Sequence, residues 1–215
     1  MRPVICVITP PAPPGAAAEQ AMIDRLGAAA RAGAHLIQIR QPQFDGRALT
    51  RLVERSVQAA QGTAARILVN DRVDVALTAG AHGVHLRGDS MPAARVRAIA
   101  PPGFLIGRSV HAAGEGARAA QDGNLDYLIF GTVFTSRSKP GVEAAGLEAL
   151  AAACAASALP VLAVGGMALP RLGAVARAGA AGFAAIGLFA EGPLDAMPLV
   201  VQRASSAFDT LGRVP

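Results

Sequence analysis

Short apolar runs alternate with longer, alanine-rich stretches along almost the whole chain. Most of the runs are continuously apolar, which is typical of parallel strands that are buried on both faces. Eight of them are predicted to form strands: Val4–Ile8, Leu36–Ile39, Ile67–Val69, Val84–Leu86, Leu105–Ile106, Tyr127–Phe130, Val161–Val164 and Phe183–Ile186.

The stretches between these runs predict helices over 18–32, 46–61, 72–79, 91–99, 112–121, 146–157, 168–178 and 195–211. The tripeptide Ala-Gly-Ala occurs at 32–34, 79–81 and 178–180, each time just before a strand, and a glycine there fits the end of a helix. Eight strands, each followed by a helix, predict an α/β fold, a single (β/α)8 TIM barrel that spans 1–215 as one domain. A doubly wound open sheet is the alternative, but no glycine-rich fingerprint follows the first strand.

Composition narrows the class of protein. Apolar residues make up 52% of the chain and charged residues 16%, which excludes a disordered protein. No apolar run approaches the ~20 residues of a membrane span, and the opening VICVI is too short for a signal peptide core. Cys6 and Cys154 lie in apolar surroundings, so we expect buried thiols in a reducing compartment rather than a disulfide. These features predict a cytoplasmic protein without a membrane partner.

The net charge of +5 comes from 20 basic and 15 acidic residues. A nucleic-acid site would show clustered cations interleaved with aromatic residues, whereas here the arginines are scattered and Trp is absent. The charge therefore favours a phosphorylated small molecule over nucleic acid as the partner. A homo-oligomer is also compatible with the sequence.

The active site of such a barrel gathers at the carboxyl ends of its strands. The loops after strands seven and eight often bind phosphate there, since glycines let backbone amides approach an anion. The sequences GGM and IGLF at these two ends indicate a phosphate site on Gly165, Gly166, Gly187 and Leu188; two ordinary glycine turns are the alternative. Lys139, the only lysine, lies in the polar loop after strand six, where it is either a site residue or a solvated side chain.

Several segments together resemble the thiamine phosphate synthase/TenI superfamily: QIR at 38–40, VNDRVDVALTAGAHGVHL at 69–86, GRSVH at 107–111, FGTVFTSRSKPG at 130–141 and LAVGGM at 162–167. The resemblance covers residues 4–192, and GRSVH, FG-VF and GGM are closer to the TenI branch. It implies a barrel that binds a thiazole bearing a phosphorylated arm. Synthases of the family join this thiazole to hydroxymethylpyrimidine diphosphate with Mg²⁺ and expel pyrophosphate. TenI-type members bind a thiazole carboxylate phosphate, and some aromatise it by proton transfer.

Position by position, the resemblance implies substrate-binding roles for Gln38, Asn70, Ser109, Ser136 and Ser138. It assigns Arg40 to the diphosphate, Lys139 to a loop that contacts the substrates and Asp71 to Mg²⁺. The phosphate cradle falls on the same residues that the glycine pattern indicates, namely Gly165, Gly166, Gly187 and Leu188.

The chain also departs from the synthase pattern. Pro42 stands where synthases carry a lysine, and Ser90 replaces the second magnesium-binding aspartate. Mg²⁺ favours carboxylate and phosphate oxygens, so these changes predict a weakened magnesium–diphosphate site unless Asp89 or Arg87 compensates. No organic cofactor is expected.

The chain also departs from the pattern of the TenI-type tautomerases, because Thr132 stands where these enzymes carry a histidine. Imidazole titrates near neutral pH, so His111 is the candidate base in its place, with capping of the following helix as its alternative role. The main hypothesis is a TenI-like thiazole tautomerase in which His111, Lys139 and Arg40 act in catalysis. The alternatives are a thiamine phosphate synthase and a non-catalytic, regulatory protein that binds thiazole phosphate.

Overall fold

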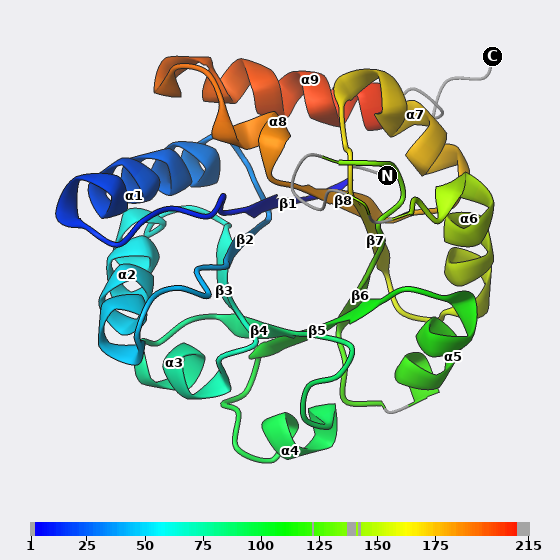
Figure 1. Cartoon of the computed structure of the whole chain (residues 1–215), viewed down its shortest axis with the longest axis horizontal. Helices are drawn as coiled ribbons and strands as arrows, with labels where there is room; N and C mark the ends of the chain where they lie inside the picture. Colours follow the sequence, from blue (N-terminus) through cyan, green and yellow to red (C-terminus); the bar gives the residue numbers. More distant parts are fainter. Residues whose placement is uncertain (1–2, 122, 137–140, 142, 210–215) are drawn as a thin grey trace.

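A computed structural model describes residues 3–121, 123–136, 141 and 143–209. Within them, eight parallel strands pair in chain order and close into a barrel, as the sequence predicts (Figure 1). The strands are β1 (Val4–Ile8), β2 (Leu36–Ile39), β3 (Arg66–Asn70), β4 (Gly83–Leu86), β5 (Leu105–Val110), β6 (Tyr127–Phe130), β7 (Val161–Val164) and β8 (Gly182–Ala185).

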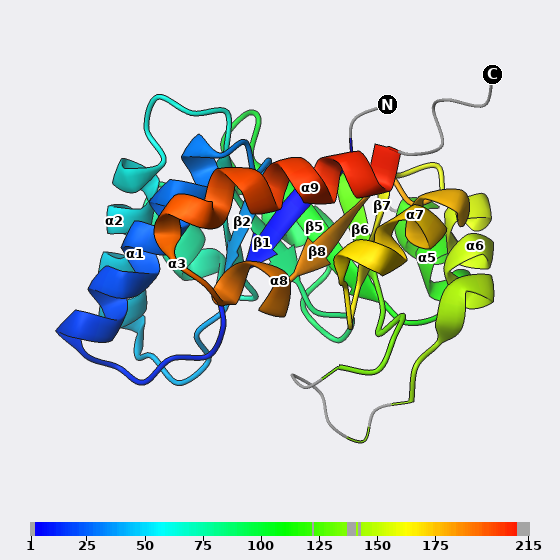
Figure 2. The same ribbon diagram turned by 90° about the horizontal axis from the view of Figure 1, so that it is seen from above.

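The helices form a ring around the strands (Figures 1 and 2). They are α1 (Ala16–Arg31), α2 (Gly46–Ala59), α3 (Val73–Thr78), α4 (Ala93–Arg97), α5 (Ala113–Gln121), α6 (Gly146–Ala156), α7 (Leu169–Arg177), α8 (Gly187–Ala190) and α9 (Met197–Asp209), with a 3-10 turn η1 (Leu194–Ala196). Long α9 packs on α7 and α1, next to the seam where β8 meets β1. None of the helices in the described ranges is long and apolar enough to cross a membrane.

Four strands differ from the sequence prediction. β3 is one residue longer at each end, and β4 begins one residue earlier, at Gly83. The differences at β5 and β8 have physical reasons. β5 continues to Val110, four residues past the predicted end. The prediction stopped too early because polar residues interrupt the apolar run, although the strand itself goes on. Ser109 therefore lies within the strand. β8 begins one residue early at Gly182, where a Cβ atom would lie 2.0 Å from the carbonyl oxygen of Val4. Only glycine allows β8 and β1 to approach so closely, so this glycine is part of a strand and not of a turn.

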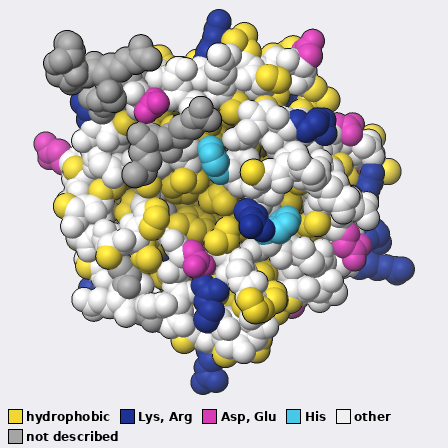
Figure 3. Space-filling model, turned by 180° about the vertical axis from the view of Figure 1, so that it is seen from behind, with side chains coloured by type: hydrophobic (Ala, Val, Ile, Leu, Met, Phe, Trp, Pro, Cys, Tyr) yellow, Lys and Arg dark blue, Asp and Glu magenta, His cyan; other side chains and the backbone are white. Residues whose placement is uncertain are grey.

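The chain has two apolar cores. One lies between the strands and the helices, and the smaller one fills the barrel itself with Cys6, Ile8, Leu36, Leu68, Tyr127, Ile129, Leu162 and Ala184. Figure 3 shows the end of the barrel where the strands begin, with hydrophobic side chains gathered at its centre. Both cysteines are free; Cys6 is buried and Cys154 only half-buried, so the expectation of two buried thiols holds fully for Cys6 alone.

Two histidines, each just before a strand, lie at the end of the barrel where the strands begin. His35 Nδ1 accepts a hydrogen bond from the N–H of Ile5 at 3.2 Å, and His82 Nδ1 accepts one from Ile67 at 2.9 Å. These contacts satisfy backbone groups at the strand starts.

At the opposite end, a buried glutamine ties the loop after β1 to the loop after β2. Gln41 Nε2 donates to Thr9 Oγ1 at 3.0 Å and to the carbonyl of Pro10 at 2.7 Å, while Gln41 Oε1 accepts from the N–H of Ala12 at 3.1 Å. Thr9 Oγ1 also accepts from the N–H of Arg40 at 2.9 Å. This network fixes the backbone from which the Arg40 side chain reaches the mouth of the barrel.

Replacing Gln41 by alanine should destabilise the fold, because buried backbone groups of the first loop lose their partners. We expect a loss of about 2 kcal/mol in the free energy of unfolding, measured by urea denaturation. The exposed Gln61, in the turn after α2, provides the matched control, and Gln61→Ala should change stability by less than ~0.5 kcal/mol. Equal effects of the two substitutions would show that the buried network does not hold the loops.

Candidate functional site

An open cavity of about 840 Å³ lies at the carboxyl ends of the strands, over the β2–β5 side of the barrel. Four of the residues singled out in the sequence meet in its lining: Arg40 after β2, Asn70 at the end of β3, Ser109 in β5 and His111 just after β5. Parallel strands bring their carboxyl ends to one rim, so residues that are 71 positions apart in the chain line the same hollow.

The cavity is rich in arginine, since its lining also includes Arg87, Arg108 and Arg118. The guanidinium groups of Arg40 and Arg118 make no hydrogen bond or ion pair within the described ranges. Among the described residues, Arg108 donates to the backbone carbonyls of Met91 at 2.6 Å, Gly88 at 3.2 Å and Arg87 at 3.5 Å and to no carboxylate, so no described carboxylate neutralises its charge. With two carboxylates in the lining, Asp89 and Glu115, the cavity keeps a positive balance that suits an anion.

The sequence analysis did not single out Arg108 and Arg118. Their positions could have indicated them. Arg108 lies in the middle of β5, and Arg118 lies in the helix that follows, one or two turns after its start. The signal was missed because the predicted strand ended at Ile106, which separated these arginines from the rim.

Gln38 lies deeper, in the barrel interior, with only 2% of its surface exposed. Its amide nitrogen Nε2 is buried and has no hydrogen-bond partner in the described part of the chain. Leaving such a donor unsatisfied costs about 1–3 kcal/mol, so this amide is suited to a hydrogen-bond acceptor on a ligand. This observation supports the substrate-binding role that the resemblance implies.

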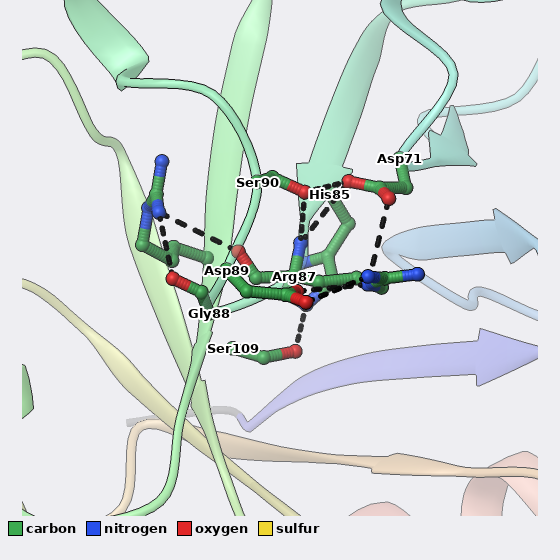
Figure 4. Close-up of polar contacts among 8 residues, drawn as sticks. Asp71, His85, Arg87, Gly88, Asp89, Ser90 and Ser109 are labelled. Carbon is green, nitrogen blue, oxygen red and sulfur yellow. Dashed lines mark hydrogen bonds and ion pairs between the residues drawn. The ribbon is translucent and has the colours of Figure 1, made fainter.

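The loop after β4 folds over the end of β3 (Figure 4). Asp71 has a φ of 61°, in the left-handed region that aspartate tolerates better than most residues. Its carboxylate accepts a hydrogen bond from the Ser90 hydroxyl and lies 3.5 Å from Nε of Arg87. Arg87 also donates to Asp89 at 3.0 and 2.8 Å, and these hydrogen bonds hold the pKa of Asp89 below its usual value. One guanidinium thus engages both carboxylates.

This donor set does not fit a magnesium site held by the protein. Mg²⁺ requires near-octahedral oxygen ligands, usually one or two carboxylates with water and phosphate oxygens. Here Asp71 and Asp89 are both paired with Arg87, and a hydroxyl stands at position 90. In the described part of the chain, no group of three His, Cys, Asp or Glu side chains is placed to hold a metal ion. The role of Asp71 as a metal ligand stays a prediction.

The ends of β7 and β8 are neighbours on the other side of the mouth. Within the described residues, the N–H groups of Gly165, Gly166, Gly187 and Leu188 donate no hydrogen bond, which leaves them free for an anion. Gly166 has a φ of 61°, and a Cβ atom there would lie 2.5 Å from the carbonyl oxygen of Thr135, so glycine is required. The exposed Arg171 donates to the carbonyl of Gly166 at 2.6 Å and adds positive charge beside these amides. The geometry suits the predicted phosphate cradle.

His111 is exposed at the cavity rim. Its Nδ1 atom contacts the carbonyl oxygen of Gly131, and a carbonyl only accepts, so Nδ1 carries a proton, and in the neutral tautomer the lone pair is on Nε2. The backbone N–H of His111 donates to Glu115 at 2.7 Å, so a carboxylate, and not the imidazole, caps the start of α5. The imidazole therefore remains available as a base.

The loop after β6 carries the remaining candidates. Ser136 is the last described residue before a gap, and Ser138 and Lys139 lie outside the described residues. Their predicted contacts with a substrate stay predictions.

Comparison with known proteins identifies relatives across almost the whole barrel. The family model described as "Thiamine monophosphate synthase" matches residues 5–189. A thiamine-phosphate synthase from Chlorobium luteolum is 36% identical over 185 residues, which cover 86% of this chain and 84% of that protein. A second one, from Anaeromyxobacter dehalogenans, is 43% identical over 155 residues, or 72% of this chain and 69% of that protein. Among solved structures, the thiamine phosphate pyrophosphorylase from Pyrococcus furiosus superposes with a TM-score of 0.79 at 29% identity, covering 94% of this chain and 96% of that one.

The pairing of Arg87 with both carboxylates predicts a small effect of Mg²⁺ on anion binding. We expect the affinity for pyrophosphate, measured by calorimetry, to change less than about tenfold, or ~1.4 kcal/mol, when Mg²⁺ is added. Ser90→Asp should increase this metal dependence because it supplies a further carboxylate, whereas the matched variant Ser90→Ala should not. A large magnesium-dependent gain in the unmodified protein would show that its carboxylates are free to bind the metal.

Proposed function

Because the chain belongs to the thiamine monophosphate synthase family, we propose that it joins a phosphorylated thiazole to hydroxymethylpyrimidine diphosphate and releases pyrophosphate. The names of the relatives favour this transferase over the TenI-like tautomerase that the sequence analysis put first. A phosphorylated thiazole is the partner expected in either case.

The proposal is supported by two regions at one mouth whose groups are suited to binding anions. Free amides gather at the ends of β7 and β8, while unpaired arginines line the cavity over β2–β5. A reaction between a monophosphate and a diphosphate needs two such regions. An isomerase acting on a thiazole carboxylate phosphate would have only a single carboxylate to pair besides its phosphate, and this would not need several arginines.

In this reaction, the arginines would stabilise the leaving group, pyrophosphate. The bond between the pyrimidine methylene carbon and the diphosphate oxygen breaks, its electron pair leaves with pyrophosphate, and the thiazole nitrogen forms a new bond to the methylene carbon. Negative charge builds up on the leaving diphosphate, and the guanidinium groups of Arg40 and Arg118 would lie where they can stabilise it. Arg87 would add charge from the β4 loop.

The uncharged parts of the substrates need hydrogen bonds of a different kind. The unsatisfied amide of Gln38 and the hydroxyl of Ser109 are suited to the polar edge of a pyrimidine, and Asn70 lies in the same lining. Gly165, Gly166, Gly187 and Leu188 would hold the thiazole phosphate across the mouth. Both rings would then meet above the centre of the barrel, with the reacting atoms oriented by their anionic groups.

A second function has one specific observation in its favour. The imidazole of His111 lies at the cavity rim with Nδ1 bonded to a carbonyl, so Nε2 is the atom that would accept a proton in thiazole carboxylate aromatisation. The role of Lys139 in that reaction would be to stabilise the carboxylate. A protein that binds thiazole phosphate without chemistry is the remaining outcome, and the experiments below distinguish all three.

Incubation with both synthase substrates should yield thiamine phosphate and pyrophosphate, detected by chromatography and by a coupled pyrophosphate assay. Arg40→Ala should lower kcat/KM by about 10²–10³-fold, the usual effect of removing one electrostatic stabiliser. The exposed Arg177 at the end of α7 gives a matched control, and Arg177→Ala should retain activity. Equal activity of the two variants would contradict the role of the arginine cavity.

The isomerase alternative predicts a different sensitivity. If aromatisation of thiazole carboxylate phosphate occurs, His111→Ala should slow it by about 10²–10⁴-fold and leave phosphate-driven binding nearly intact, as single-turnover rates and calorimetry would show. An unchanged rate would mean that the base is another residue. A protein inactive on both sets of substrates, yet binding thiazole phosphate, would be the binding protein.

A further inference from the structure

Three neighbouring strands bring a buried tyrosine and a buried histidine to the same level of the barrel. The pairing register places His85 of β4 opposite Gly107 of β5, and Gly107 opposite Tyr127 of β6. His85 and Tyr127 are only 2% and 5% exposed, and their ring centroids are 5.6 Å apart. The two rings therefore meet across β5, inside the barrel.

Gly107 makes this contact possible. A Cβ atom there would lie 2.1 Å from Cζ of Tyr127 and 2.5 Å from its hydroxyl oxygen, so any side chain would displace the ring. Side chains two residues apart on a strand point to the same face, so Ser109 follows Gly107 on the inner face, one step nearer to the cavity. Ser109 lines that cavity.

A continuous hydrogen-bonded chain results. The Tyr127 hydroxyl lies 3.1 Å from His85 Nδ1, and His85 Nε2 lies 2.9 Å from the hydroxyl oxygen of Ser109 (the contact with Ser109 is drawn in Figure 4). Burial, helped by the nearby Arg108, lowers the pKa of His85 to about 3, so the imidazole is neutral at ordinary pH. A neutral imidazole donates through one nitrogen and accepts through the other, so the chain must run in one direction.

The surroundings of Tyr127 decide the direction. Within the described ranges, its hydroxyl has no hydrogen-bond partner other than His85, and a buried O–H without an acceptor is costly. Tyr127 must therefore donate to Nδ1, which requires that Nε2 carries the proton and donates to Ser109. The reverse direction would leave the tyrosine proton without an acceptor.

We propose that Tyr127 and His85 are positioning residues that make the Ser109 hydroxyl a hydrogen-bond donor towards the cavity. Because His85 donates to the oxygen of Ser109, the serine proton is free to point at a ligand. The site then selects a ring that presents a lone pair, such as an unprotonated nitrogen of a heteroaromatic ring, over one that presents an N–H. The identity of that ring as the pyrimidine rests on the proposed function; the direction of the chain does not.

The tautomer of His85 tests the direction in the ligand-free protein. Long-range ¹H–¹⁵N spectra of protein labelled with [¹⁵N]histidine should show His85 as a neutral Nε2–H imidazole throughout pH 5–8, with the signal assigned by its loss in His85→Asn. Tyr127→Phe, which removes only the hydroxyl, should give a mixture with the Nδ1–H form. An Nδ1–H tautomer in the unmodified protein would overturn the proposal.

Binding of hydroxymethylpyrimidine, without its diphosphate, tests the consequence. We expect Ser109→Ala to weaken binding about tenfold, the effect of one hydrogen bond, and Tyr127→Phe to weaken it by a smaller factor. The double variant should bind no more weakly than Ser109→Ala, because the tyrosine acts through the serine. Independent, multiplying losses would overturn the proposal. If the unmodified protein binds no pyrimidine, the proposed function fails, and the tautomer still decides the present inference.

Discussion

The closure of eight parallel strands into one barrel is the constraint on which the site depends. It brings eight strand ends to a single rim, so that residues far apart in sequence, such as Arg40 and His111, line one cavity. The same closure forces strands together so tightly that glycines are required at contacts such as Gly182 with Val4, and Gly107 with Tyr127. The interior of the barrel is apolar where the strands begin and polar where they end. The apolar end therefore contributes to stability, and the polar end carries the candidate site.

Charge is distributed unevenly around that rim, and this asymmetry shapes the proposed chemistry. In the proposed function, backbone amides at the ends of β7 and β8 would form a neutral cradle for one phosphate, while guanidinium groups over β2–β5 would offer full charges to another. Arg87 differs from the other arginines because it pairs with Asp89 and with Asp71, the residue that the family resemblance assigns to Mg²⁺. An arginine keeps its charge at any physiological pH and needs no dehydration of an ion, but it cannot draw as many phosphate oxygens together.

Much of this could be predicted from the sequence. Continuous apolar runs predicted four of the strand ranges without error, and the glycine pattern pointed to the ends of β7 and β8, where phosphate binding stays a prediction. What could not be predicted depends on three-dimensional register. The polar residues of β5 interrupt an apolar run, so Arg108 and Ser109 looked like loop residues, and nothing local links Tyr127 to His85 across an intervening strand. The orphaned amide of Gln38 likewise becomes visible only when its surroundings are known.

The central claim is that one mouth holds two different anions at the same time. A crystal structure of the protein with both thiazole phosphate and pyrophosphate would test it most directly. The account predicts the monophosphate on the amides of Gly165–Gly166 and Gly187–Leu188, and pyrophosphate on Arg40 and Arg118 across the mouth. If the two anions instead compete for a single position, with the arginine cavity left without phosphate, the claim is contradicted.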